Sequence, residues 1–282
     1  MGKLDGRVAF ITGAARGQGR SHAVRLAGEG ADIIAVDLCE PIATMNYPLS
    51  TPEDLAQTVK EVEALDRRIL ASKADVRHRD QLVRALEEGI ATFGRLDIVV
   101  VNAGILPGKD NGLCDGFVDA TDVDLIGAMN TVAASLPHLE AGASIIVTGS
   151  TAGMMKGTTE RIGVSGGVGY FWSKQVLIRY VEVLALQLAP HMVRLNGIHP
   201  TNCDTHLIHN IDVYRAFRPD LEAPTREDAV AAFPAMQAMP IPYIDPIDVS
   251  HLVAFLASDE ARYITGCNIR VDAGAMLKAP PV

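Results

Sequence analysis

The sequence predicts a single-domain α/β fold in which a doubly wound parallel sheet of seven strands is flanked by helices. Short runs of β-branched residues alternate with longer amphipathic segments, which is the pattern of βαβ units. Most of these short runs are almost continuously apolar, as expected for strands that helices cover on both faces. With 282 residues, 48% of them apolar, the chain can bury a large core within one domain.

The expected strands are short runs rich in Val, Ile and Ala that end at turn residues. They span residues 8–12, 32–37, 69–74, 96–101, 144–148, 193–199 and 268–271. Between them, an apolar spacing of about 3.6 residues predicts helices. These span residues 17–28, 52–65, 79–93, 121–136, 170–188 and 246–257.

Three stretches interrupt this alternation. Residues 39–51 form an insertion after the second strand, and residues 154–169 form a glycine-rich piece before the 170–188 helix. Residues 201–245 are rich in Pro, Met and Phe and follow the sixth strand, at the carboxyl edge where open α/β sheets bind ligands. We therefore expect residues 201–245 to form a substrate lid within the single domain of residues 1–282.

A glycine-rich turn lies between the first strand and the first helix. Gly13, Gly17 and Gly19 let the backbone approach a pyrophosphate and present the N–H groups of the helix N-terminus to it. A turn that serves chain reversal alone is disfavoured because a strand precedes it and a helix follows it. The turn therefore predicts a dinucleotide site of the Rossmann type.

Asp37 ends the second strand, where a carboxylate accepts hydrogen bonds from the ribose hydroxyls of NAD and repels the 2′-phosphate of NADP. Arg16 favours the opposite choice, since a guanidinium could pair with that phosphate. Its alternative is a surface or pyrophosphate-side Arg, which we favour because Asp37 holds the more decisive position. We predict that the cofactor is NAD.

Two further strand ends fit a dinucleotide. Asp75 and Val76 follow the third strand, from which a carboxylate and the next backbone N–H could reach an adenine ring. Asn102, Ala103 and Gly104 follow the fourth strand, where small residues permit close approach to a cofactor. A tight turn stabilised by the Asn side chain explains this second motif equally well.

The candidate catalytic residues are Ser150, Tyr170 and Lys174. Tyr170 and Lys174 are four residues apart, so they share one helix face and the ammonium can favour the phenolate. Ser150 follows the fifth strand. The alternative is core packing with an extended Lys side chain, which the neighbouring dinucleotide turn disfavours. The three residues predict a proton acceptor for dehydrogenation.

In these motifs, and in the segment of residues 196–200, the chain resembles the short-chain dehydrogenase/reductase family along nearly its whole length. Residues 13–22, 36–39, 199–201 and 258–266 further resemble the mycofactocin-coupled, carveol-dehydrogenase-like subgroup. That resemblance implies NAD that does not exchange and is reoxidised by mycofactocin. The family usually forms homotetramers, so we expect one here.

The resemblance also implies roles for individual residues. Tyr170 would act as acid and base, Lys174 would lower its pKa and bind the nicotinamide ribose, and Ser150 would orient the substrate oxygen. Asp124 stands where relatives place an Asn in a proton relay. The cofactor contacts that we expect are Gly13, Arg16, Gly17, Gln18, Gly19, Asp37, Leu38, Asp75, Val76, Asn102, Ala103, Gly104, Tyr170, Lys174, Pro200, Cys203 and Thr205.

Charge and composition disfavour several classes of binding partner. A net charge of −9 without a basic run disfavours nucleic acid and anionic membranes. The four cysteines are scattered like reduced thiols, and no signal peptide or membrane span is recognisable, so we expect a cytoplasmic protein. His199, His206 and His209 are candidate metal ligands, and the last two are one helical turn apart. No carboxylate or Cys pattern completes a metal site with them, so we expect none.

Three functions fit these features. The first is an NAD-dependent dehydrogenase for a hydrophobic, alicyclic or terpenoid secondary alcohol, favoured by the apolar lid. The second is a carbonyl reductase with freely exchanging NAD(H). The third is a dinucleotide-binding sensor without activity, which the presence of Ser150, Tyr170 and Lys174 disfavours.

Overall fold

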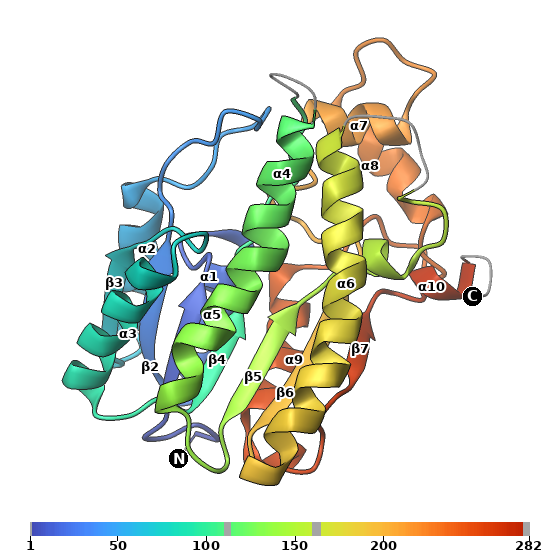
Figure 1. Cartoon of the computed structure of the whole chain (residues 1–282). Helices are drawn as coiled ribbons and strands as arrows, with labels where there is room; N and C mark the ends of the chain where they lie inside the picture. The colour runs from blue at the N-terminus through green and yellow to red at the C-terminus, as the bar shows by residue number, and fades with distance from the viewer. Residues whose placement is uncertain (1, 110–113, 160–164, 279–282) are drawn as a thin grey trace.

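Seven parallel strands form one sheet in the order β3-β2-β1-β4-β5-β6-β7 (Figure 1). The computed structural model describes residues 2–109, 114–159 and 165–278. The strands are β1 (Val8–Thr12), β2 (Asp32–Asp37), β3 (Ile69–Lys73), β4 (Ile98–Val101), β5 (Ser144–Thr148), β6 (Arg194–Pro200) and β7 (Asn268–Val271). The predicted fold class is confirmed, and the predicted strand ends differ by at most two residues. Strand order reverses between β1 and β4, which creates a ligand-binding crevice at their carboxyl ends.

Helices cover both faces of the sheet. One face is covered by α1 (Gly17–Gly28), α2 (Pro52–Glu63) and α9 (Pro246–Ala257), and the other by α3 (Arg79–Phe93), α5 (Gly127–Ser135) and α6 (Ser165–Leu188). Alternate strand residues point to opposite faces, so Phe10 belongs to one buried cluster whereas Ala9 and Ile11 belong to the other. This double cover explains why the strands are apolar throughout.

The single helix predicted over residues 121–136 is wrong in detail. The structure has α4 (Asp115–Thr121), a π-helical turn (Asp122–Ile126), α5 and a short 3₁₀ turn (Leu136–His138). Residues 115–121 carry too few apolar side chains to show a helical period, yet α4 packs along α6 with the rings of Phe117 and Trp172 5.8 Å apart (Figure 1). The π-helical turn places Asp124 inside the protein.

Helix α6 begins at Ser165, five residues before the predicted start at Tyr170. The glycines that suggested a loop allow close helix packing instead. A Cβ atom on Gly166 would lie 2.4 Å from the carbonyl oxygen of Pro107, and one on Gly169 would lie 2.8 Å from the Cα atom of Phe117. Thr151–Met154 forms a 3₁₀ turn. Residues 160–164 of the predicted irregular piece lie outside the described residues.

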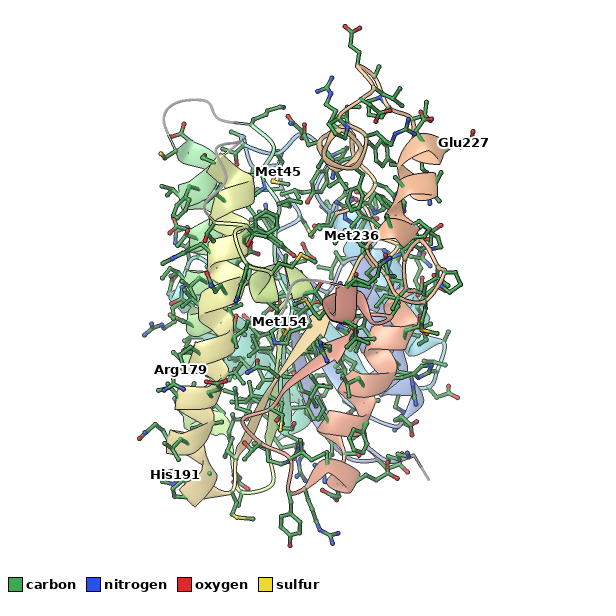
Figure 2. All side chains as sticks on the ribbon, turned by 90° about the vertical axis from the view of Figure 1, so that its right-hand side faces the viewer. Met45, Met154, Arg179, His191, Glu227 and Met236 are labelled. Carbon is green, nitrogen blue, oxygen red and sulfur yellow. The ribbon has the colours of Figure 1, made fainter. Side chains whose placement is uncertain are left out.

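Residues 201–245 contain α7 (Ile211–Phe217), α8 (Arg226–Ala232) and a 3₁₀ turn (Phe233–Ala235), which the sequence did not predict. They share a small core of their own that contains Ile208, Val213, Ala229 and Phe233. In Figure 2, Met236 from this segment lies beyond the carboxyl ends of the strands, as do Met45 and Met154. A further short helix, α10 (Ala275–Lys278), follows β7. Within the described ranges, no helix is both long and apolar enough to cross a membrane.

Candidate active site

The glycine-rich turn connects β1 to α1 at the crevice. Gly13 and Gly17 have φ values of +66° and +57°, which disfavour any side chain. A Cβ atom on Gly19 would lie 1.9 Å from the carbonyl oxygen of Gly13. The absence of a side chain at Gly19 therefore lets the first turn of α1 pack closely against the end of β1. The turn is also held by Asn102, whose Nδ2 donates to the carbonyl oxygens of Thr12 and Gly13. The first turn of α1 thus opens onto the crevice.

A cavity at this edge holds most of the predicted cofactor contacts. The predicted residues that line it are Gly13, Arg16, Gly17, Gln18, Asp37, Leu38, Asp75, Val76, Asn102, Ala103, Gly104 and Thr205. Gly19 lies beneath the turn and does not line it. The buried Oε1 of Gln18 has no hydrogen-bond partner within the protein. A glycine cradle, a helix N-terminus and an acidic strand end fit the pyrophosphate and ribose of a dinucleotide.

The two carboxylates of this cavity have protein partners. Asp37 Oδ2 accepts a hydrogen bond of 2.9 Å from the N–H of Ala15, and Asp37 Oδ1 accepts one from the Ser50 hydroxyl. Asp75 is paired with Arg77 at 2.7 Å. Burial opposes ionisation of Asp75, but hydrogen bonds from Arg77 outweigh it and keep the pKa of Asp75 below its usual value. Both carboxylates are therefore oriented in the absence of any ligand contact.

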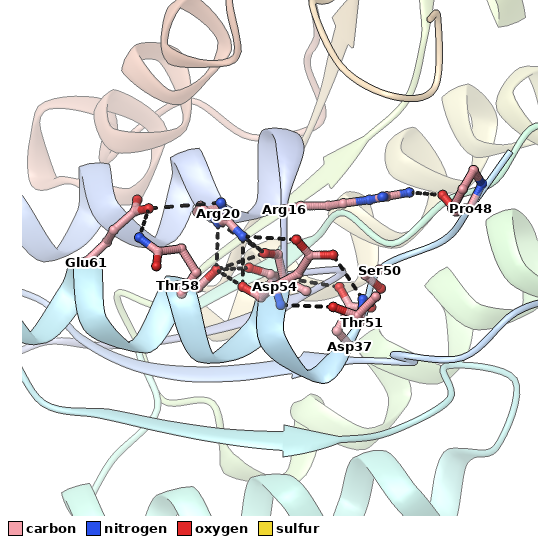
Figure 3. Close-up of polar contacts among 12 residues, drawn as sticks. Arg16, Arg20, Asp37, Pro48, Ser50, Thr51, Asp54, Thr58 and Glu61 are labelled. Carbon is pink, nitrogen blue, oxygen red and sulfur yellow. Dashed lines mark hydrogen bonds and ion pairs between the residues drawn. The ribbon is translucent and has the colours of Figure 1, made fainter. Parts of the chain in front are cut away.

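Residues 39–51, called the strap below, contribute Ile42, Tyr47, Leu49 and Ser50 to the lining of this cavity. Figure 3 shows the contacts of Pro48 and Ser50. Pro48 accepts a hydrogen bond from Arg16 through its carbonyl oxygen, and Ser50 binds Asp37. Arg16 lines the cavity and is held by the strap. Tyr47 lines the cavity and is largely buried. The sequence did not single out Tyr47, because an insertion without periodicity gives no sign of which side chain points inward.

The strap is also attached to the substrate side of the site. Thr44 donates through its hydroxyl to Asp119 at 2.6 Å, and its carbonyl oxygen accepts from the N–H groups of Gly108 and Lys109. Asn46 donates to Asp212 of α7. The strap therefore joins the cofactor turn, the segment after β4 and the lid.

Arg20 connects the helix after the strap to the glycine-rich turn (Figure 3). Its guanidinium donates to the carbonyl oxygens of Ala15 and Asp54 and to the Thr58 hydroxyl. Thr58 in turn donates to the carbonyl oxygen of Ala14. These contacts fasten α2, and with it the end of the strap, to the turn.

Ser150, Tyr170 and Lys174 meet in a second cavity. Gln18, Asn102, Gly104 and Thr205 line both cavities, so the two are continuous, and Pro200 and Cys203 line the second. Ser150 is hydrogen-bonded to the Tyr170 phenol. Lys174 donates to the carbonyl oxygen of Thr148 at 3.1 Å, and its Nζ lies 5.5 Å from the centroid of the Tyr170 ring.

The electrostatics of this cluster differ from the simple expectation that Lys174 acidifies Tyr170. Burial raises the pKa of Tyr170; its hydrogen bond with Ser150 lowers that pKa, and the charge of Asp124 raises it. Asp124 lies 3.8 Å from Lys174 and offsets the ammonium charge. The ion pair thus weakens the effect that Lys174 would have on Tyr170.

Asp124 is buried beside Lys174 in the π-helical turn. Its Oδ1 accepts a hydrogen bond of 2.9 Å from the N–H of Ile105, whereas its Oδ2 is buried without a partner. Burial raises the pKa of Asp124 to about 6, although Lys174 and the N–H of Ile105 act in the opposite direction. This carboxyl group therefore titrates in the neutral range.

Cys203 and the two histidines of the lid have identifiable environments. Burial raises the pKa of the Cys203 thiol, so that thiol stays protonated. His209 binds Asp204 at 2.6 Å and also contacts Arg226 and Tyr214. In the part of the chain that the structure describes, no group of three or more His, Cys, Asp or Glu side chains is arranged to hold a metal ion.

A dinucleotide crevice that continues into a Ser-Tyr-Lys cluster defines an oxidoreductase that uses a nicotinamide dinucleotide. Residues 13–276 match the family model described as Enoyl-(Acyl carrier protein) reductase. A (-)-trans-carveol dehydrogenase of Rhodococcus erythropolis is 44% identical over 284 residues, which cover 99% of this chain and all of that protein. The chain belongs to the short-chain dehydrogenase/reductase family.

Solved structures agree with this assignment. Carveol dehydrogenase from Mycobacterium avium in complex with NAD has a TM-score of 0.90 and 44% identity, and the match covers 99% of this chain and 100% of that one. A short chain dehydrogenase from Mycobacterium paratuberculosis bound to NAD has a TM-score of 0.84 and 37% identity, with 98% and 100% covered. The protein is an NAD-dependent dehydrogenase, and the prediction of NAD as its cofactor is confirmed.

Proposed function

We propose that the protein oxidises a hydrophobic secondary alcohol, alicyclic or terpenoid in type, to the corresponding ketone, with Tyr170 as acid and base. The main support is the hydrogen bond between Ser150 and Tyr170 beside Lys174, at the junction of the two cavities. The lid contributes Leu207 and Ile208 to this junction and suits an apolar substrate. The carveol dehydrogenase relative supports the same substrate class.

In this proposal each of the three side chains has one task. Ser150 binds the substrate oxygen, and Tyr170 accepts the hydroxyl proton as hydride leaves the carbinol carbon. Lys174 holds the charge near Tyr170 and binds the nicotinamide ribose. Bound NAD supplies the hydride acceptor. Asp124 is the fourth candidate and would bind the water that relays the proton from Lys174. In reverse, Tyr170 would return the proton to a ketone.

We propose that the remaining predicted residues hold NAD. Gly13, Gly17 and Gln18 would surround the pyrophosphate, with Gly19 packed beneath the turn that holds them. Asp37 and Leu38 would contact the adenosine ribose. Asp75 and Val76 would contact the adenine. Pro200, Cys203 and Thr205 would contact the nicotinamide carboxamide through their backbone.

The strap supports a second part of the proposal, namely that NAD does not exchange and that mycofactocin reoxidises it. The strap lines part of the cavity that contains Asp37 and is tied to Arg16, Asp119 and Asp212. Release of the dinucleotide would require several of these bonds to break together. A freely exchanging carbonyl reductase is the alternative.

We also propose a homotetramer, in which α4 and α6 contribute an interface. Both helices lie at the front of the view in Figure 1. They expose apolar side chains, including Val118, Trp172, Val183 and Leu186. Leu186 is 71% exposed, and its burial at an interface would be favourable. Light scattering on the purified protein tests this proposal. A cytoplasmic location remains a prediction.

The function is tested on protein purified without added nucleotide. The denatured protein is analysed for NAD by mass spectrometry, and the native protein is assayed with carveol and cyclohexanol, with either free NAD or an artificial electron acceptor. We expect stoichiometric NAD and acceptor-dependent turnover. If the protein carries no bound nucleotide and reduces added NAD, the proposal that NAD does not exchange is wrong, whereas the proposed dehydrogenase activity is supported. Reduction of ketones without oxidation of any alcohol would favour the carbonyl reductase.

A further inference from the structure

His199 lies at the end of β6, next to the cluster, and none of the roles proposed above uses it. It is only 1% exposed. Its Nδ1 lies 3.3 Å from the backbone carbonyl oxygen of Ser150, and its Nε2 lies 2.8 Å from the side-chain oxygen of Asn268 in β7. The imidazole therefore spans the distance between the backbone of Ser150 and a neighbouring strand.

Two glycines make the space for this ring. A Cβ atom on Gly149 would lie 2.3 Å from His199 Cε1. On the other side, a Cβ atom on Gly197 would lie 2.5 Å from Asn268 Oδ1 and 3.0 Å from His199 Nε2. No other residue type fits at either position without displacing the imidazole or its partner, so the ring occupies a shaped slot.

The hydrogen-bond donors along this path can be assigned. Asn268 Nδ2 donates to the carbonyl oxygen of Ile178 at 3.2 Å, so the amide oxygen of Asn268 faces His199 and accepts from Nε2. Nδ1 then faces the carbonyl oxygen of Ser150, which accepts from the N–H of Gly153. Burial keeps the pKa of His199 below its usual value, so the neutral ring carries its one proton on Nε2. Nδ1 therefore does not donate, and the ring contacts the carbonyl oxygen of Ser150 by packing alone.

The path joins the catalytic groups. Ile178 lies on α6, two helical turns after Tyr170 and one after Lys174. Starting there, the contacts run through Asn268 and His199 to the carbonyl oxygen of Ser150. The serine and the helix that carries the tyrosine and lysine are thus connected by side-chain contacts through β6 and β7, in addition to the direct bond between Ser150 and Tyr170.

We propose that His199 is a positioning residue for the oxidation. Its ring packs against the backbone of Ser150 in the slot beside Gly149, and Asn268 braces the ring through Nε2, so that the Ser150 hydroxyl stays aligned with Tyr170 and the substrate oxygen. This inference rests on the proposed function of Ser150 and Tyr170. It predicts loss of turnover, with little change in substrate affinity, when the contact with Ser150 is removed.

The test compares three substitutions of His199 with carveol as the alcohol and a redox dye as the electron acceptor. His199→Leu removes the donor to Asn268, His199→Gln keeps an amide donor near the position of Nε2, and His199→Asn has an amide only near the position of Nδ1. We expect His199→Leu to lower kcat about 10- to 100-fold, with KM and bound NAD close to those of the wild type. His199→Gln should restore most of kcat, and His199→Asn should not.

Two controls separate positioning from general stability. Ser144→Ala removes a buried hydrogen bond to the carbonyl oxygen of Leu256 from the opposite end of β5, and should lower the melting temperature without changing kcat. Asn268→Ala removes the brace and leaves the imidazole, so it should lower kcat less than His199→Leu. This variant provides the test if His199→Leu does not fold.

Crystal structures give a readout that does not depend on activity, because Ser150 should be displaced in His199→Leu and return in His199→Gln. Wild-type kcat in His199→Leu, or losses that only follow the melting temperatures, would overturn the inference. Ser150→Ala separates failure of the proposed function from failure of the role proposed for His199. If Ser150→Ala is fully active, the proposed function fails; if it is inactive while His199→Leu is active, only the role of His199 fails.

Discussion

The strap and the lid both interrupt the regular βα alternation, but they are held in place in different ways. The strap, residues 39–51, is attached through hydrogen bonds to Arg16, Asp37, Asp119 and Asp212. The lid, residues 201–245, contains two helices and a buried cluster around Phe233. Among the described residues, Asn46 and Asp212 form the hydrogen bond that joins the two segments.

This difference indicates separate tasks. A segment held by polar contacts around the cofactor cavity should govern how long NAD stays bound. A segment with its own apolar core should keep its shape and govern which alcohol fits. We therefore expect substitutions in the strap to change NAD retention and substitutions in the lid to change KM.

The largest effect is expected at Tyr170, which belongs to neither segment. Tyr170→Phe removes the hydroxyl and keeps the ring, so it should lower kcat about 10²- to 10⁴-fold through loss of acid–base catalysis. Bound NAD and melting temperature should stay near the wild type, as measured by mass spectrometry and calorimetry. Turnover at the wild-type rate would exclude Tyr170 as the acid and base.

The lid is tested at Phe233, which is fully buried and packs edge-on against Phe217 with ring centroids 4.6 Å apart. Phe233→Ala should destabilise the lid by about 3–5 kcal/mol, raise KM for carveol and leave bound NAD unchanged. Hydrogen exchange should report local opening of α7 and α8. Met239→Ala, at an exposed lid position, is the matched control. Loss of NAD from Phe233→Ala would contradict separate tasks.

The strap is tested with Thr44→Val and Ser50→Ala combined, because neither change adds bulk. Each lost hydrogen bond is worth about 0.5–1.5 kcal/mol, so the double variant should release NAD about tenfold faster during dialysis, with KM unchanged. Thr92→Val serves as control, since that hydroxyl bonds only Glu88 of its own helix. If the double variant retains NAD like the wild type, these strap contacts do not hold the cofactor.

The smallest effect on rate is expected at Asp124. Its charge raises the pKa of Tyr170. The neutral amide of Asp124→Asn should lower that pKa and move the acid limb of the kcat/KM profile to lower pH. An unchanged limb, or one moved to higher pH, would show that Asp124 does not act on Tyr170 in this way.

The same residue predicts a pH dependence of stability. The folded-state pKa of Asp124, about 6, lies above its ordinary value, so the folded protein binds more protons than the unfolded chain between those two values. The stability that Asp124 contributes is present below about pH 4 and is lost as the pH rises through about 6. Urea unfolding between these values should therefore show a weaker pH dependence in Asp124→Asn than in the wild type.

The sequence was most informative where chemistry and backbone geometry coincide. The strand ends at Asp37 and Asn102 and the glycine-rich turn were predicted because parallel strands bring their carboxyl ends together. The sequence was least informative where contacts between distant segments determine the local conformation. Gly166 and Gly169 look like loop residues but allow α6 to pack against Pro107 and Phe117. Helices α7 and α8 were missed because each has only seven residues, which is too few for the spacing of apolar residues to show a helical period.

The side chains that surround the catalytic cluster show the same limit. Tyr47 and His199 reach the site only through the path of the strap and the pairing of β6 with β7. Asp124 was identified by its position relative to a family motif, and its burial depends on the π-helical turn. These contacts join residues that are far apart in the sequence, so the spacing of residues along the chain does not predict them.

The transfer of hydrogen from substrate to cofactor tests the central claim most directly. Carveol deuterated at the carbinol carbon is mixed with the protein for a single turnover, and the dinucleotide released by denaturation is weighed by mass spectrometry. Our account predicts that the nicotinamide gains one deuterium in the wild type, and gains it about 10²- to 10⁴-fold more slowly in Tyr170→Phe. Ketone formation without deuterium in the dinucleotide would contradict hydride transfer to bound NAD.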